Sequence, residues 1–273
     1  MRSLRILNKI RSPHTDHPFQ SKYDGDKQLI SHMLRILYKS LEKNPTKWIV
    51  EFGVHGNDGG VFLDFLIRDG YSGVLIEGTK SGFSEVEQIY KKISNRITCI
   101  NAYVEPTGEN SLDNLLHSTS CPEIFDVLLI DIDSIDYQVW ESLKNYHPIF
   151  VIIEFNNEYG PNLKRIHNVI LNKWLGETSF AAGSSIKSIV ELGRTKGYSL
   201  VTTTRNNAYF VREEFLHAFH LDEVNIDDLF DYSLFDIRRS ILSFKQLVQF
   251  YCIYGYPLFI NKLKKLIGKN LKK

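Results

Sequence analysis

The sequence predicts an α/β protein built on a mostly parallel sheet, and three observations support this. Four short apolar runs each end on a polar residue: WIVE (48–51), VLIE (74–77), ITCIN (97–101) and VLLID (127–131). Stretches of helix length separate them, as in sheets whose parallel strands are buried on both faces. Later, two runs at 198–203 and 207–211 form a hairpin pattern. The polar strand ends should meet at one edge of the sheet, where open α/β sheets bind ligands.

Apolar spacing predicts the elements in chain order. A helix is expected over 26–43, because apolar residues recur at helical spacing and Asn44-Pro45 ends the pattern. The first strand follows at 47–52, then a glycine loop at 53–60, a short helix whose apolar side faces the sheet, and a second strand at 73–77. A helix over 85–92 and a strand over 97–101 complete the first half.

The second half continues the alternation of helices and strands. A short helix begins near Ser111, strand four ends at 131, a helix covers 135–145 and strand five covers 149–155. Residues 156–182 form a connection far longer than the usual length of about four to six residues, which is typical of lids and binding loops. A helix that opens at 183–185 and runs to 196 then leads into the hairpin.

Composition limits the class of protein. The chain has 273 residues, 43% of them hydrophobic, and three cysteines without metal-site or disulfide spacing, so we expect a reducing, cytoplasmic location. We find neither a secretion signal nor an apolar run of about 18 residues. The net charge is +1, but both ends are basic and the body is acidic, which argues against nucleic-acid binding. The tail at 257–273 is compatible with an amphipathic helix that covers the core or lies on an anionic membrane.

The glycine loop and Glu77 predict a nucleotide-like ligand. Glycines at 53, 56, 59 and 60 let the backbone approach a ligand, but their spacing differs from the GxGxxG of dinucleotide-binding folds. Such loops are also common as tight turns. A carboxylate at Glu77, the end of the second strand, can accept hydrogen bonds from both hydroxyls of a ribose, although a solvated strand-end acid is the alternative.

Glu51 ends the first strand and discriminates between cofactors by charge. Its carboxylate can accept a hydrogen bond from an ammonium group or an ordered water, whereas it repels a pyrophosphate. The position therefore favours a cationic tail, such as the methionine part of S-adenosylmethionine, over the anionic bridge of NAD.

Carboxylates and an amide also follow strands four and five. Hard oxygen ligands suit Mg²⁺, so Asp133, Glu154 and Asn156 are candidate metal ligands. We assign Asp131 to the cofactor side and Asp133 to the side of an acceptor substrate. These acids could instead cap the helix at 135–145, so metal dependence stays open.

Other side chains are candidates for the reaction and for the acceptor. Four could serve as a general base: Asp133, Asp136, Glu154 and His55. His55 lies in the glycine loop, where lone histidines are usually solvated. Tyr137, Asn156 and Tyr159 have the amide and aromatic chemistry that a carbohydrate needs.

Five segments closely resemble the FkbM-like branch of the class I S-adenosylmethionine-dependent methyltransferases: WIVEFGVHGNDGG (48–60), GVLIEG (73–78), DVLLIDIDSIDYQVWESL (126–143), VIIEFN (151–156) and GSSIKSIVELGRTKGYSLV (183–201). The resemblance covers residues 47–212. It implies a Rossmann-like, seven-stranded, mostly parallel sheet of order 3-2-1-4-5-7-6 with helices on both faces, and O-methyl transfer. His55, Asn57 and Ser134 depart from the usual family residues, which makes the acceptor less transferable.

The resemblance also implies roles for individual residues. Glu51 and Gly53, with Gly56 of the same loop, would border the methionine part of the cofactor. Glu77 would bind the ribose, Asn101 with Ala102 the adenine, and Asp131 the amino group. Asn101 could instead cap a turn.

Three interpretations of function follow. The preferred one is an S-adenosylmethionine-dependent O-methyltransferase that acts on a sugar of a surface polysaccharide, a lipopolysaccharide or a glycosylated metabolite. The alternatives are an NAD(P)-dependent oxidoreductase and a non-catalytic scaffold. We expect a basic segment and helix at 1–45, the methyltransferase domain at 46–212 and a helical appendage with a basic tail at 213–273. Peripheral membrane contact through this tail and a homo-oligomer are compatible with the sequence.

Overall fold

A computed structural model describes residues 24–42, 44–54, 59–91, 95–167, 183–204, 206–219 and 226–230. The glycine-loop residues His55 and Gly56, residues 168–182 and the basic ends lie outside these ranges, as does most of the expected appendage. The described strands are β1 (Trp48–Phe52), β2 (Ser72–Glu77), β3 (Ile97–Asn101), β4 (Val127–Ile130), β5 (Phe150–Glu154), β6 (Tyr198–Thr203) and β7 (Asn207–Arg212).

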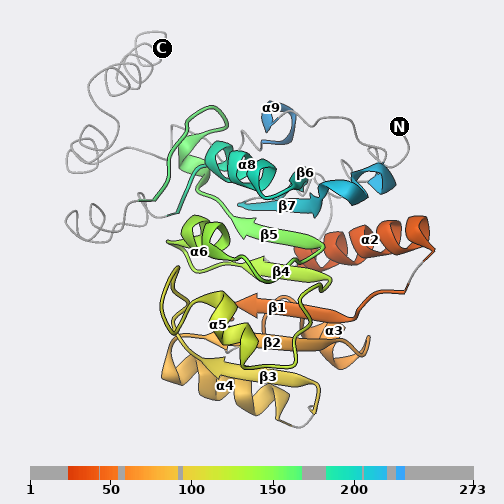
Figure 1. The fold of residues 1–273 in the computed structure, drawn as a ribbon, viewed down its shortest axis with the longest axis vertical. Helices are drawn as coiled ribbons and strands as arrows, with labels where there is room; N and C mark the ends of the chain where they lie inside the picture. Colours follow the sequence, from red (N-terminus) through yellow and green to blue (C-terminus); the bar gives the residue numbers. More distant parts are fainter. Residues whose placement is uncertain are drawn as a thin grey trace, which may run out of the picture.

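These strands form one seven-stranded sheet of order β3-β2-β1-β4-β5-β7-β6, so the predicted order and hairpin are confirmed (Figure 1). Strands β1 to β5 pair in parallel, and β7 is antiparallel to both β5 and β6. The strand order reverses where β1 lies beside β4, which brings Phe52 into register with Ile130. Ligands of open α/β sheets bind at the carboxyl ends of the strands next to such a reversal.

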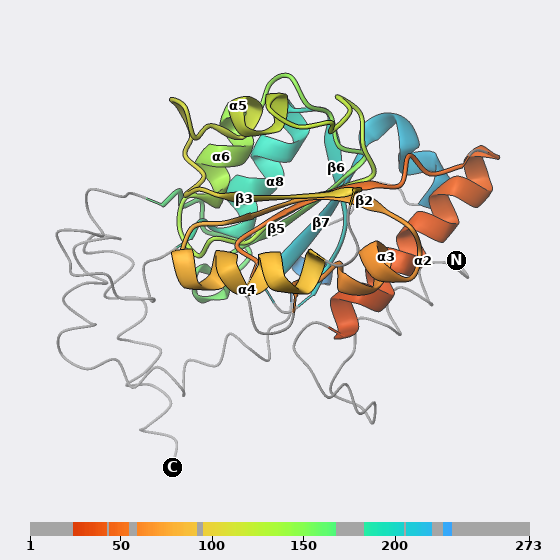
Figure 2. The same cartoon turned by 90° about the horizontal axis from the view of Figure 1, so that it is seen from below.

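Helices cover both faces of the sheet, as predicted (Figure 2). One face carries α2 (Asp24–Leu41), α3 (Leu63–Ile67) and α4 (Lys80–Tyr90). The other carries α5 (Leu112–His117), α6 (Asp136–Ser142) and α8 (Ile186–Thr195). Helix α4 begins five residues before the predicted residue 85, because the Thr79 hydroxyl accepts the Gly82 N–H and caps it. The glycine in this first turn hid the start from the apolar pattern.

Apolar side chains pack into one cluster on each face of the sheet. The centre of the α5–α6–α8 side is Trp140, fully buried against the rings of Tyr198 and Phe210. On the other side, α2 inserts Leu29, Met33 and Leu37, at the helical spacing seen in the sequence. The strands are therefore buried on both faces, which explains their unbroken apolar character.

A buried carboxylate joins α2 and the chain leading into β1 to the start of β4. Asp126 is fully buried and accepts hydrogen bonds from the Tyr38 hydroxyl, the Thr46 hydroxyl at 2.8 Å and the Lys47 N–H at 2.8 Å. A buried charge needs such donors, because desolvation without them would cost several kcal/mol or more. This contact fixes the amino-terminal end of the sheet, opposite the ligand edge.

Short elements continue the chain beyond these layers. They are the 3-10 helices η1 (Asn157–Tyr159) and η3 (Glu213–Phe219) and the helix α9 (Ile226–Leu229). The Thr203 hydroxyl donates to the carbonyl of Leu229 at 2.5 Å, which ties α9 to the end of β6. In the part of the chain described here, no helix is both long enough and apolar enough to cross a bilayer.

Candidate functional site

Polar strand ends lie on one face of the carboxyl edge of the sheet. In β1, β2, β3 and β5 the apolar residue before the polar end packs on the α5–α6–α8 side: Val50, Ile76, Ile100 and Ile153. Because side chains alternate along a strand, the next residue of each strand points to the α2–α3–α4 side. Those residues are Glu51, Glu77, Asn101 and Glu154. The sheet therefore brings together on one face four of the residues predicted from the sequence.

Glu51 accepts hydrogen bonds from the backbone at the start of α3. It is 3% exposed, and its oxygens accept the backbone N–H groups of Val61 at 2.8 Å and Phe62 at 3.3 Å. Gly60, at φ +83, packs against this carboxylate, where an added Cβ would lie 2.7 Å from Oε1. Glu51 therefore uses the free N–H groups of the helix N-terminus that a phosphate would otherwise need.

Gly53 is the point where β1 meets β4. Its φ is +81, and an added Cβ would lie 1.8 Å from the carbonyl oxygen of Asp131. Only glycine combines this backbone conformation with this approach. The predicted glycine of the cofactor loop thus sets the spacing between the two strands at the reversal of strand order.

Glu77 keeps one carboxylate oxygen available at the end of β2. Its Oε1 accepts the Thr79 N–H at 2.8 Å and the Thr79 hydroxyl at 2.6 Å. Within the described ranges no donor contacts Oε2. The side chain is thus held in one orientation with an acceptor oxygen to spare, which suits recognition of a hydroxyl.

Asn101 and Ala102 hold the turn that follows β2. The Asn101 amide donates to the carbonyls of Glu77 at 2.8 Å and Gly78 at 3.1 Å, and the Ala102 N–H donates to Glu77 at 3.2 Å. The exposed ring of Tyr103 packs against Gly78, where a Cβ would lie 2.5 Å from it. The turn-capping alternative for Asn101 is therefore observed, and its role toward an adenine stays a prediction.

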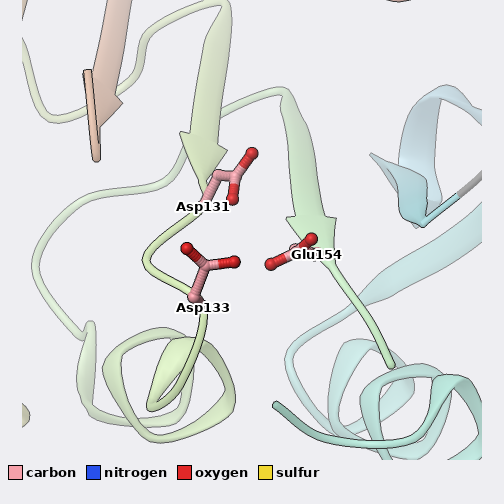
Figure 3. Close-up of side chains that lie close together, drawn as sticks. All are labelled: Asp131, Asp133 and Glu154. Atoms are coloured by element: carbon pink, nitrogen blue, oxygen red, sulfur yellow. The ribbon is translucent and has the colours of Figure 1, made fainter. Parts of the chain in front are cut away.

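Three carboxylates converge beyond β4 and β5. One oxygen each of Asp131, Asp133 and Glu154 lies within 4.8 Å of the others, and Figure 3 shows the side chains pointing toward one another. We call these residues the carboxylate cluster. Asp131, which we expected on the cofactor side alone, thus lies with the two residues assigned to the acceptor.

Asp133 lies in a turn between β4 and α6. Asp133 adopts φ +60, a left-handed conformation that Asp tolerates better than most residues. Asp136 is 1% exposed and accepts the N–H groups of Ile132 and Ser134, each at 2.9 Å. Both of its oxygens therefore hold the turn. We expected Asp136 to face an acceptor, but the structure makes it a positioning residue.

Burial and mutual repulsion raise pKa values at the carboxylate cluster and at the neighbouring Asp136. Burial, and then repulsion by the neighbouring carboxylates, raises the pKa of Glu154 to about 9, although the Asn206 hydrogen bond opposes this shift. Burial raises the pKa of Asp136 to about 7, with a smaller contribution from Asp131. A positive charge placed among these groups would relieve the repulsion.

The residues predicted to contact an acceptor have different surroundings. Asn156 accepts the Glu158 N–H at 2.9 Å through its side-chain oxygen, so it caps η1. Tyr159 is 5% exposed and does not present the open aromatic face that we expected. Tyr137 is half-buried near Glu141 and Lys164, at the start of α6. None of these three side chains belongs to the carboxylate cluster.

Sequence reasoning missed two side chains of the site. The Thr79 hydroxyl orients Glu77, and Asn206 donates to Glu154 from the β6–β7 turn. The first had a local signal, a threonine two residues after the strand-end acid. Asn206 lies 52 residues from Glu154, and only the pairing of β7 with β5 brings them together.

Comparisons with known proteins concern the fold. The chain matches no protein-family model and no curated protein. Among solved structures it is similar to monomeric WbdD, with 14% identity over 76% of this chain and a TM-score of 0.44. The chain spans 48% of WbdD, less than half its length.

Two further structures are similar at the same level. The O-methyltransferase from Bacillus cereus in complex with SAH has 15% identity over 77% of this chain and 87% of that protein, with a TM-score of 0.42. Magnesium protoporphyrin IX methyltransferase (ChlM) from Synechocystis PCC 6803 with bound SAH has 13% identity over 77% and 94%, with a TM-score of 0.42. At these identities the likeness describes the fold alone.

Proposed function

We propose that this chain is an S-adenosylmethionine-dependent O-methyltransferase whose acceptor is a sugar hydroxyl of a surface polysaccharide, a lipopolysaccharide or a glycosylated metabolite. One observation carries the proposal. The available oxygen of Glu77 and the carboxylate cluster lie at the same edge of the sheet, on opposite sides of β1. A ligand bound across β1 would find a hydrogen-bond acceptor for ribose hydroxyls at the Glu77 end and negative charge at the cluster end. These two features match the ribose and the sulfonium charge of S-adenosylmethionine.

The protein has a limited task in such a reaction. A bound cofactor would supply an activated methyl carbon to the acceptor oxygen, and the electron pair of the broken C–S bond would stay with sulfur. The hydroxyl proton must go to a base, and the cofactor supplies the activated methyl group. The residues of this chain would align the two reactants, with the attacking oxygen about 3 Å from the methyl carbon.

If no metal ion is bound, Glu154 is the preferred acceptor of that proton. A cation beside the carboxylate cluster, such as the sulfonium, opposes the repulsion that raises the pKa of Glu154 and so favours the ionised, proton-accepting form. Asp136 would act by holding the turn that carries Asp133. His55 lies outside the described residues, and its role as a base stays a prediction.

The carboxylate cluster also fits a divalent cation. Its three oxygen donors are the hard ligands that Mg²⁺ and Mn²⁺ prefer, and their mutual repulsion favours an added positive charge. Asp131, Asp133 and Glu154 would hold the ion. When bound, Mg²⁺ would lower the pKa of a hydroxyl beside it. Asn156, the other predicted ligand, is engaged in capping η1.

A nicotinamide-dependent oxidoreductase is less well supported. Dinucleotide-binding folds have strand order 3-2-1-4-5-6, whereas here the antiparallel β7 lies between β5 and β6. In addition, Glu51 already accepts the N–H groups of Val61 and Phe62, near the place where a pyrophosphate would bind.

Isothermal titration tests the cofactor. The full chain should bind S-adenosylhomocysteine and not NADH, and Glu77→Ala should weaken binding about 10- to 100-fold, because hydrogen bonds to a charged group contribute about 1.5–3 kcal/mol. Glu85→Ala, which removes the same charge from an exposed position of α4, should bind like the parent chain. Absence of measurable binding by the parent chain would refute the proposal.

Turnover separates the enzyme from a scaffold. Once an acceptor is found by transfer of a labelled methyl group to candidate sugars, Glu154→Ala should abolish transfer. Its affinity for S-adenosylhomocysteine, which lacks the sulfonium charge, should be unchanged. Transfer at the parental rate by this variant would remove Glu154 from the mechanism.

A further inference from the structure

The turn between β6 and β7 reaches Glu154 from the side opposite β4. The Asn206 side-chain amide donates to Oε1 of Glu154. The backbone N–H of Phe155 donates to the Asn206 carbonyl at 2.7 Å. One residue of the turn thus holds both the side chain of Glu154 and the backbone that follows it.

The turn is itself anchored to helix α2. The Thr204 hydroxyl donates to Oδ1 of Asp26 at 2.9 Å, and the Tyr209 hydroxyl donates to the same oxygen. Asp26 is 7% exposed, so these contacts are shielded from water. Within the turn, the Thr204 N–H donates to the Asn207 carbonyl at 2.9 Å. These hydrogen bonds therefore hold Asn206 in place beside Glu154.

This contact engages one of the two oxygens of Glu154. Oε1 is occupied by Asn206, and over the described ranges no other donor contacts the carboxylate. Oε2 accepts no hydrogen bond there, and Glu154 points toward Asp131 and Asp133 (Figure 3). Without the amide, rotation about the side-chain bonds would spread the carboxylate over several orientations.

We propose that Asn206 is a positioning residue that orients Glu154, so that one of its oxygens joins Asp131 and Asp133 in binding a hard divalent cation. The inference rests on the metal site of the proposed function and adds a residue to it from a distant part of the chain. Side chains that orient metal ligands commonly change metal affinity about 10- to 100-fold when they are removed.

Titration of the metal-free full chain with Mn²⁺ tests this inference. Asn206→Leu removes the amide at similar size, and Asn206→Ala is the second variant in case the larger side chain disturbs the turn. Both should bind Mn²⁺ about 10- to 100-fold more weakly than the parent chain. Both should bind S-adenosylhomocysteine with parental affinity, which reports an intact fold.

Thr203→Val is the matched control. It removes one buried hydrogen bond from the same hairpin, to Leu229, and leaves the contact with Glu154 in place. It should bind Mn²⁺ like the parent chain. Parental Mn²⁺ affinity in the two Asn206 variants, or an equal loss in Thr203→Val, would overturn the role of Asn206 alone. Failure of the parent chain to bind Mn²⁺ would overturn the metal site and the inference together.

Discussion

Substitution of Gly53 tests whether the approach of β1 to β4 supports the cofactor site. Gly53→Ala places a Cβ 1.8 Å from the Asp131 carbonyl oxygen, on a residue whose φ is +81. No side-chain rotation relieves this clash, because the contacted atom is backbone. The strand ends must therefore separate, and this moves the Asp131 end of the carboxylate cluster.

Gly197 provides the matched control. Its φ is +78, yet an added Cβ would meet nothing within 4 Å, and it lies before β6 at the opposite edge of the sheet. Gly197→Ala therefore carries only the left-handed penalty of about 1–2 kcal/mol. Gly53→Ala adds an overpacking cost of about 1–3 kcal/mol. For a chain of this size about 1 kcal/mol lowers Tm by about 2–4 °C.

Thermal unfolding and titration with S-adenosylhomocysteine give the two readouts. Gly53→Ala should melt several degrees below Gly197→Ala and lose cofactor affinity, whereas Gly197→Ala should keep parental affinity. Equal melting temperatures for the two variants, together with parental affinity in Gly53→Ala, would refute the link between this glycine and the site.

Three further predictions concern stability, strain and pH. Tyr38→Phe should lower the free energy of unfolding by about 1 kcal/mol in urea titrations, because Asp126 loses one of several donors; a loss below about 0.3 kcal/mol would contradict this. Asp133→Gly should raise Tm slightly by relieving φ +60 and should weaken Mn²⁺ binding; an unchanged or lower Tm would argue against backbone strain at this residue. In EDTA, the stabilising contribution of Glu154 should be complete below pH about 4.5 and be lost as pH rises through about 9, because the folded state holds its proton more tightly than the unfolded chain. Urea titrations from pH 5 to 9 should therefore show a shallower decline in Glu154→Gln, and parallel declines would reject the raised pKa.

The sheet and the edge at which its polar residues gather could be predicted from the amino-acid pattern. Buried parallel strands require nearly unbroken apolar runs, and such runs are visible without coordinates. The polar residue that ends each run then lies at the carboxyl edge, since parallel strands share one direction. Strand β3 was predicted residue for residue at Ile97–Asn101.

The hydrogen-bond partners of the edge residues could be learned only from the folded structure. We assigned Asp131 and Asp133 to different reactants, but both lie beside Glu154, in a stretch where Asp133 is left-handed and Asp136 accepts two backbone N–H groups. Glu51 and Asn101 were read as ligand contacts, whereas each also satisfies backbone groups of a neighbouring turn. Asn206 reaches Glu154 through a pairing of strands distant in sequence. These outcomes depend on hydrogen bonds between segments that no local pattern records, because such bonds form only after the strands have paired.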